Sequence, residues 1–178
     1  MVTQQLHYGA TAKIFHWLVV ILLIMQFLVG WLMPGVRKGM TPGSAMTIHI
    51  SFGVTILIII VARFAWRLTH PVAPLVSLPR WQKMTSEFVH WLLYATVFVT
   101  TFTGWFFAST RGWTIRLFEL IPLPQLVSQG SSFGHAVGAF HTTLTWALLA
   151  LVAVHVAASL AHFFLYKDGV LQRMLSAE

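Results

Sequence analysis

Four long apolar segments, separated by short stretches that hold most of the prolines and charges, make up most of the chain. A helix of about 20 mainly apolar residues spans the hydrocarbon core of a bilayer. The pattern therefore predicts an all-α membrane protein, a bundle of four transmembrane helices over Lys13–Met33, Ala45–Leu68, Thr85–Ala108 and residues 136–166.

The connections between these segments carry turn signals. Pro34-Gly35 follows the first segment, and Val72–Lys83 is a proline-rich, basic stretch typical of a surface loop. The longest connection contains an amphipathic piece near Trp113–Leu120, which we expect to lie on the membrane surface. The first residues lack the basic start and small-residue cleavage site of a signal peptide, so we expect the first helix to be retained.

The composition agrees with a core that lies in lipid. The chain is 57% hydrophobic and 8% charged, whereas an ordinary soluble domain is about 25% charged. We therefore expect residues 1–178 to form one integral membrane domain, with membrane lipid and no nucleic acid among its partners. The absence of cysteine excludes disulfides, thiolate-ligated iron–sulfur clusters, covalent haem attachment and a cysteine nucleophile.

The distribution of basic residues predicts the orientation. Four spans place both termini on one side, which holds Lys13, Arg63, Arg67, Arg80, Lys83, Lys167 and Arg173. The other side holds Arg37, Lys38, Arg111 and Arg116. The positive-inside rule then favours two cytoplasmic termini. With only Glu119 opposing its four cations, the outer face would steer a small anion inward; anionic lipid headgroups are the alternative partner.

Six histidines fall inside the apolar segments, where an ionisable side chain is costly and marks a functional candidate, and five of them form two layers. His141 and His155 are 14 residues apart on the last segment, which puts both near one helix face and about 21 Å apart along the axis. Because helix directions alternate, His49 shares the outer leaflet with His141. His16 and His90 share the inner leaflet with His155.

Two histidines from different helices that face each other at one depth are what a six-coordinate haem requires. The outer layer pairs His49 with His141, but in the inner layer His16 and His90 compete as partner of His155. A hydrogen bond to a neighbouring helix is the alternative role for any one of them. A His-based metal transporter is a rival function, but the segments contain almost no carboxylate, which divalent ions usually need.

The 14-residue spacing recurs on the other three segments, where it leads from a histidine to Gly30, Gly104 or Arg63. These glycines, together with Gly53 one turn after His49, would let a flat ring approach the backbone. Glycines are also common at membrane helix contacts generally. Arg63 would lie at the inner edge, where it would meet a haem propionate or else extend to lipid phosphate.

Several motifs resemble the bacterial cytochrome b561 family over essentially the whole chain. They are Phe15-His16-Trp17, M-x-I-H-x-S-x-G at Met46–Gly53, V-x-R-x-x-W-R at Val61–Arg67, E-F-V-H-W-L-L-Y at Glu87–Tyr94, and the three histidines of the last segment followed by Y-K-D. The chain is also similar to the cytochrome b subunits of membrane hydrogenases and formate dehydrogenases. The resemblance implies a four-helix bundle that encloses two non-covalent b-type haems.

Carried onto this sequence, the resemblance implies the haem ligands His49 and His141 for the outer haem and His16 and His155 for the inner haem. His90 is then left near a propionate or a quinone. His162 lies two turns beyond His155, about 10 Å deeper, and we predict that it donates a hydrogen bond to a quinone. An interfacial histidine without a chemical role is the alternative.

The resemblance implies electron transfer across the bacterial inner membrane between a donor at the outer face and the ubiquinone pool. Superoxide is one donor that it implies, and a soluble redox partner docked at the outer face is another. A membrane anchor or electron-relay subunit that serves a separate redox protein is the alternative function.

Overall fold

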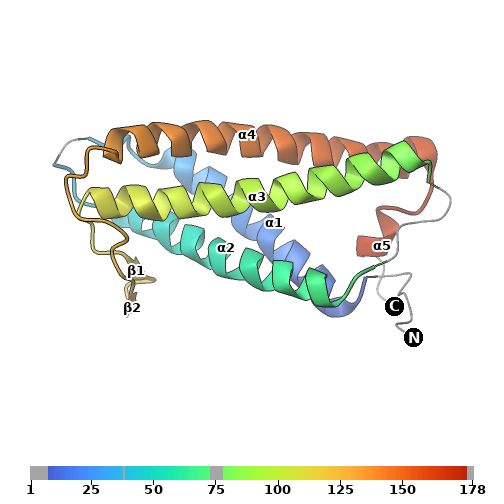
Figure 1. Ribbon diagram of the computed structural model, residues 1–178, viewed down its shortest axis with the longest axis horizontal. Coiled ribbons are helices and arrows are strands. Elements are labelled where there is room, and N and C mark those ends of the chain that lie inside the picture. The colour runs from blue at the N-terminus through green and yellow to red at the C-terminus, as the bar shows by residue number, and fades with distance from the viewer. Residues whose placement is uncertain (1–7, 38, 73–77, 176–178) are drawn as a thin grey trace.

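The computed structural model describes residues 8–37, 39–72 and 78–175, and it confirms the predicted four-helix class. The long helices are α1 (Ala10–Leu32), α2 (Ser44–Thr69), α3 (Arg80–Thr110) and α4 (Gly134–Ala161). Each is long and apolar enough to cross a membrane, α4 together with the π-helix η1 (His162–Tyr166) that continues it. They run side by side along the long axis of the molecule (Figure 1).

Packing follows the order of the chain. Helix α1 lies along α2, α2 along α3, and α3 along α4. The buried residues midway along the bundle are few, and Ile56, Ile60, Val97 and Leu148 are among them. Most other large apolar side chains point outward, as expected of helices whose surroundings are lipid.

Helix α3 begins earlier than its apolar pattern predicts. We expected it to start at Thr85, yet the helix starts at Arg80, directly after Pro79. Proline fixes φ near −65°, which suits the entry to a helix, and it ends the preceding loop at the same time. The first turn therefore contains polar residues that the apolar pattern assigned to the loop.

The segment near Trp113–Leu120, predicted to be an amphipathic piece on the membrane surface, packs against the end of the bundle. This segment forms an antiparallel hairpin of β1 (Arg116–Leu117) and β2 (Ile121–Pro122), which extends from one end of the bundle (Figure 1). Trp113 is buried against the ends of α2 and α3, and its indole N–H donates to the Met40 carbonyl at 2.9 Å. The apolar side of the segment thus covers helix ends, which offer it both packing and a hydrogen-bond acceptor.

Ser51 fastens the hairpin to α2. Its buried hydroxyl accepts a hydrogen bond from the Phe118 amide at 3.0 Å and lies 3.4 Å from the Arg116 carbonyl, to which it donates. We call this end of the molecule the hairpin end.

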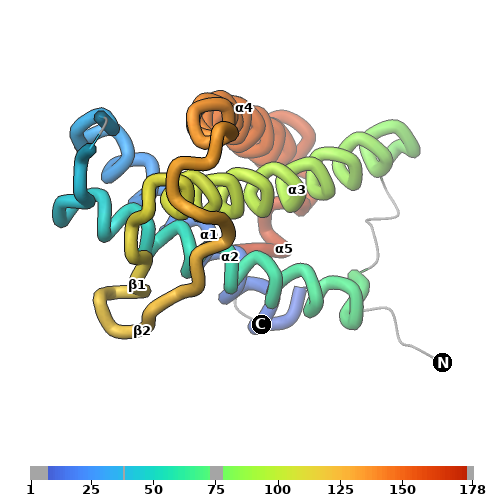
Figure 2. The backbone as a smooth tube through the Cα atoms, turned by 60° about the vertical axis from the view of Figure 1, so that its left-hand side comes forward, coloured from blue at the N-terminus to red at the C-terminus, as the bar shows by residue number. Residues whose placement is uncertain are grey.

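At the opposite end, the short helix α5 (Gln172–Leu175) folds back against the bundle (Figure 2). Lys167 has φ +51°, so the chain reverses directly after η1. The Trp17 indole N–H of α1 donates to the Met174 carbonyl at 3.4 Å, which ties α5 to the start of the bundle. We call this the α5 end.

Candidate functional site

Two histidine rings from α2 and α4 face each other near the hairpin end. The ring centroids of His49 and His141 are 6.4 Å apart, with the planes at 86°. His141 is held from α3, because its Nδ1–H donates to the Thr100 carbonyl at 2.9 Å. A carbonyl can only accept, so this bond leaves the Nε2 lone pair of His141 free for a metal.

Glycine gives these rings their space. A Cβ at Gly104 would lie 2.9 Å from His141 Cε1, closer than real Cβ contacts permit. A Cβ at Gly30 would lie 3.6 Å from His49 Cε1, which is ordinary contact, and Gly53 faces the side chain of Gln26. Two of the three glycines predicted to admit a flat ring, Gly30 and Gly104, thus lie against the histidine rings, Gly104 more tightly.

Three histidine rings gather near the α5 end. His16 of α1 and His155 of α4 have ring centroids 6.4 Å apart, the same separation as the first pair. His90 of α3 lies closer to His155, at 5.5 Å. Metal–imidazole bonds of about 2 Å on opposite sides of one ion put the two ring centroids about 6.2 Å apart. Both pairs at 6.4 Å fit that span, and His90 with His155 is too close for it.

Arg63 lies beside the α5-end rings. Its guanidinium is 3.4 Å from His16 Nδ1 and stacks over the Tyr94 ring at 5.1 Å. Arg67, one turn further along α2, lies over the Trp91 ring at 5.4 Å. Among the described residues neither arginine forms an ion pair with a carboxylate, so both positive charges are available to an anion. Both line a cavity of about 310 Å³.

His162 has a partner that the sequence did not reveal. Its Nδ1 lies 2.5 Å from the Asp168 carboxylate, and both side chains are largely buried. Asp168 also accepts a hydrogen bond from the Val170 amide at 3.2 Å. The reversal at Lys167 brings the carboxylate back to the histidine. The sequence signal for this pair is slight: Asp168 is the single aspartate of the chain and follows His162 by six residues.

Three of the four basic residues predicted on the outer face lie within the described residues, near the hairpin end. Arg111 donates to the Arg37 carbonyl at 2.6 Å, and Arg116 lies in the hairpin and donates to the Glu119 carbonyl at 3.4 Å. Lys38 lies outside the described residues.

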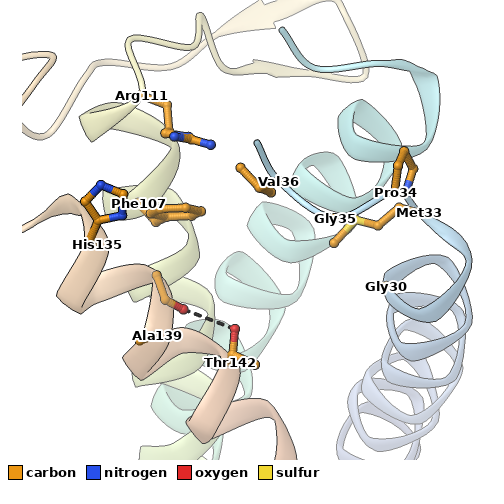
Figure 3. A pocket seen from close by; sticks show the side chains of 11 residues that line it. Gly30, Met33, Pro34, Gly35, Val36, Phe107, Arg111, His135, Ala139 and Thr142 are labelled. Atoms are coloured by element: carbon orange, nitrogen blue, oxygen red, sulfur yellow. Dashed lines mark hydrogen bonds between the residues drawn. The ribbon is translucent and has the colours of Figure 1, made fainter. Parts of the chain in front are cut away.

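A cavity of about 450 Å³ opens at the hairpin end. Figure 3 shows Arg111, Phe107 and His135 on one side of it and the end of α1, with Gly30 and Met33, on the other. Arg111 is the member of the predicted cationic set that lines this cavity. Within the described ranges, no group of three or more His, Asp or Glu side chains could hold a metal ion by themselves.

Known proteins resemble this chain along nearly its whole length. A model of the family described as prokaryotic cytochrome b561 matches residues 7–177. The chain belongs to this family. It is 28% identical to cytochrome b561 homolog 2 of Escherichia coli (strain K12) over 170 residues, which cover 94% of this chain and 90% of that protein. It is 27% identical to the probable superoxide oxidase CybB of Yersinia pestis over 161 residues, 90% of each chain.

Membership of the cytochrome b561 family makes the chain a bacterial membrane oxidoreductase that binds haem b. The structure supplies several features that a haem needs: two imidazole pairs whose separation fits two bonds to one iron, glycines that give His49 and His141 space, and an arginine that has no carboxylate partner among the described residues. Sequence reasoning missed Gln26 and Asp168, both of which contact a predicted site histidine.

Proposed function

We propose that this cytochrome b561 passes electrons between a donor at the hairpin end and ubiquinone at the α5 end, and that it holds one haem b near each end. One observation carries the proposal. Two histidine pairs with the same 6.4 Å ring separation lie at two depths of one bundle, and α4 contributes one member of each.

The ligands we propose are His49 with His141 near the hairpin end and His16 with His155 near the α5 end. For the second pair, the 5.5 Å separation of the His90 and His155 rings is shorter than two imidazoles bound to one iron would need. We therefore assign His90 to the surroundings of the haem. Haem b held by two imidazoles supplies reversible one-electron transfer without an open coordination position.

Arg63 is proposed to receive a propionate of the haem near the α5 end. Its position beside His16 and its stacking on Tyr94 support this role, because a desolvated guanidinium without a carboxylate partner stabilises an anion strongly. Gly30 and Gly104 leave room for the rings near the hairpin end, and Gly53 leaves room for the Gln26 side chain.

For ubiquinone we propose a site at His162. Reduction of one quinone takes up two electrons and two protons, so a hydrogen-bond donor that can be reprotonated must stand beside its carbonyl oxygens. The Asp168 carboxylate accepts from His162 Nδ1–H, which would orient the ring, and Nε2–H of the protonated ring would donate to a quinone oxygen. Asp168 lies on the chain reversal at the α5 end, where protons can arrive from the cytoplasm under the proposed orientation.

The donor we propose is superoxide. Two superoxide ions release one electron each and become two molecules of oxygen, and these two electrons with two protons reduce one quinone to the quinol. Arg111 at the hairpin-end cavity would attract a small anion. A relative is named a probable superoxide oxidase, which supports this choice over a soluble redox protein.

The test begins with the purified, haem-replete protein. We expect b-type bands in the dithionite-reduced minus oxidised spectrum and about two haems per chain. Superoxide, supplied enzymatically, should then reduce the haems and added ubiquinone. A preparation without a Soret band would contradict the haem proposal. Two haems that superoxide does not reduce, but a periplasmic redox protein does, would favour the relay alternative.

A further inference from the structure

Gln26 is a carboxamide in the middle of the apolar helix α1. Its Nε2 lies 3.2 Å from His49 Nε2, and its side chain lies 3.4 Å from where a Cβ on Gly53 would be. The amide therefore rests on α2 between two positions one turn apart. A polar side chain at this depth has no water to bond to, so it must find a partner in the protein.

Two polar atoms of this contact remain unpaired. Gln26 Oε1 and His49 Nδ1 are both buried without a hydrogen-bond partner among the described residues. Gln26 Oε1 is a hydrogen-bond acceptor. His49 Nδ1 carries the ring proton whenever His49 Nε2 serves as a ligand. Leaving a buried donor and a buried acceptor unpaired is costly, and a hydrogen bond between the two atoms would satisfy both.

The geometry around His49 permits this bond. A Cβ at Gly30 would lie 3.6 Å from His49 Cε1 and 3.7 Å from Nδ1, so this edge of the ring faces α1 between Gly30 and Gln26. The two nitrogens of an imidazole are only about 2.2 Å apart, and a glutamine side chain rotates about three torsions. Gly30 has no Cβ to occupy the position beside the buried Nδ1, so a carboxamide turned toward Nδ1 would meet no side chain from Gly30.

We propose that Gln26 is a positioning residue for His49: its carboxamide oxygen accepts a hydrogen bond from Nδ1–H when Nε2 ligates the haem. The inference rests on the proposed function, which makes His49 a ligand. His141 already has such an acceptor in the Thr100 carbonyl. Gln26 supplies the missing acceptor, so both ligands of this haem are held in the same tautomer.

The bond has an electronic consequence. An acceptor on Nδ1–H raises the basicity of the imidazole, which favours the oxidised iron. Gln26→Leu should therefore make the hairpin-end haem easier to reduce. Loss of one such hydrogen bond corresponds to about a tenfold change in the reduction equilibrium, which is about +59 mV for one electron. Gln26→Glu keeps an oxygen acceptor and should not raise the potential.

The experiment is a redox titration of the purified, haem-replete variants, followed optically and by electron paramagnetic resonance. Met25→Leu is the matched control, because Met25 precedes Gln26 on α1 and is 42% exposed on the surface proposed to face lipid. We expect Gln26→Leu to keep two haems and to change the potential and resonance of one. Titration in a His16→Ala background, which should retain the hairpin-end haem alone, identifies which haem responds.

Gly30→Ala offers a second test that leaves Gln26 in place. Its methyl group fits at ordinary contact distance but fills the space beside Nδ1, so the same haem should shift in the same direction. Unchanged potentials in Gln26→Leu, or equal shifts of both haems, would overturn the inference. A wild-type chain that lacks two haems would instead overturn the proposed function.

Discussion

Gly104→Ala should selectively weaken the haem near the hairpin end. The added methyl group would lie 2.9 Å from His141 Cε1 and 3.3 Å from Nδ1. The ring has little freedom to move away, because Nδ1 is bonded to the Thr100 carbonyl at 2.9 Å and Nε2 is proposed to bind iron. Overpacking costs about 1–3 kcal/mol, and a strained or lost hydrogen bond adds about 1 kcal/mol.

The higher helix propensity of alanine offsets up to about 1 kcal/mol of this cost. The haem-bound form is then destabilised by about 2 kcal/mol net. This corresponds to about a 30-fold weaker haem affinity. Haem titration of the purified protein measures this loss of affinity, and the haem-to-chain ratio and the difference spectrum show how many haems remain. Gly30→Ala is the control, since its methyl would meet His49 Cε1 at 3.6 Å and both haems should stay. Gly104→Ala that binds two haems with wild-type affinity would refute the reasoning.

Three further predictions concern the α5 end and the hairpin. His90→Ala should keep two haems while His16→Ala loses one, because the His16–His155 separation alone fits two axial bonds; the reverse haem content would overturn the ligand assignment. Asp168→Asn should retain both haems but lower quinone reduction about tenfold or more through misorientation of His162; unchanged turnover with superoxide would remove the proposed proton role. Ser51→Ala removes the hydroxyl that joins the hairpin to α2, which should cost about 1–2 kcal/mol and speed proteolysis at the hairpin with haem content unchanged; an unaltered cleavage rate would mean that packing alone holds it.

The parts of the fold and site that sequence predicted are those with strong physical requirements. Long apolar segments have few alternatives to spanning helices, and the high cost of imidazole in lipid makes His49 and His141 conspicuous. The structure then brought these two rings together at one depth. The depth argument left His16 and His90 open as partners of His155, because both lie at the right level. Only the distances of the His16 and His90 rings from the His155 ring distinguish the two candidates.

Other features depend on backbone details that carry little sequence signal. Asp168 reaches His162 because Lys167 adopts a positive φ, a conformation uncommon for a residue other than glycine. The burial of Trp113 depends on a hairpin whose turn residue Phe118, with φ +48°, gives no glycine or asparagine cue. Gln26 was overlooked because a single amide barely alters the apolar pattern of α1.

Because α4 contributes a histidine to both pairs, the spacing between the two layers is independent of the contacts that hold each pair together. The spacing between the layers follows from 14 residues on one continuous helix, about 21 Å, so it does not depend on how the other helices pack. A change that weakens the packing of α1 or α2 would therefore disturb one histidine pair without altering the distance between the two layers. Under the proposed function, the distance between the two haems would therefore tolerate mutation and thermal motion. A one-residue insertion between His141 and His155 would instead turn one of these two histidines by about 100° relative to the other, away from its partner on α1 or α2.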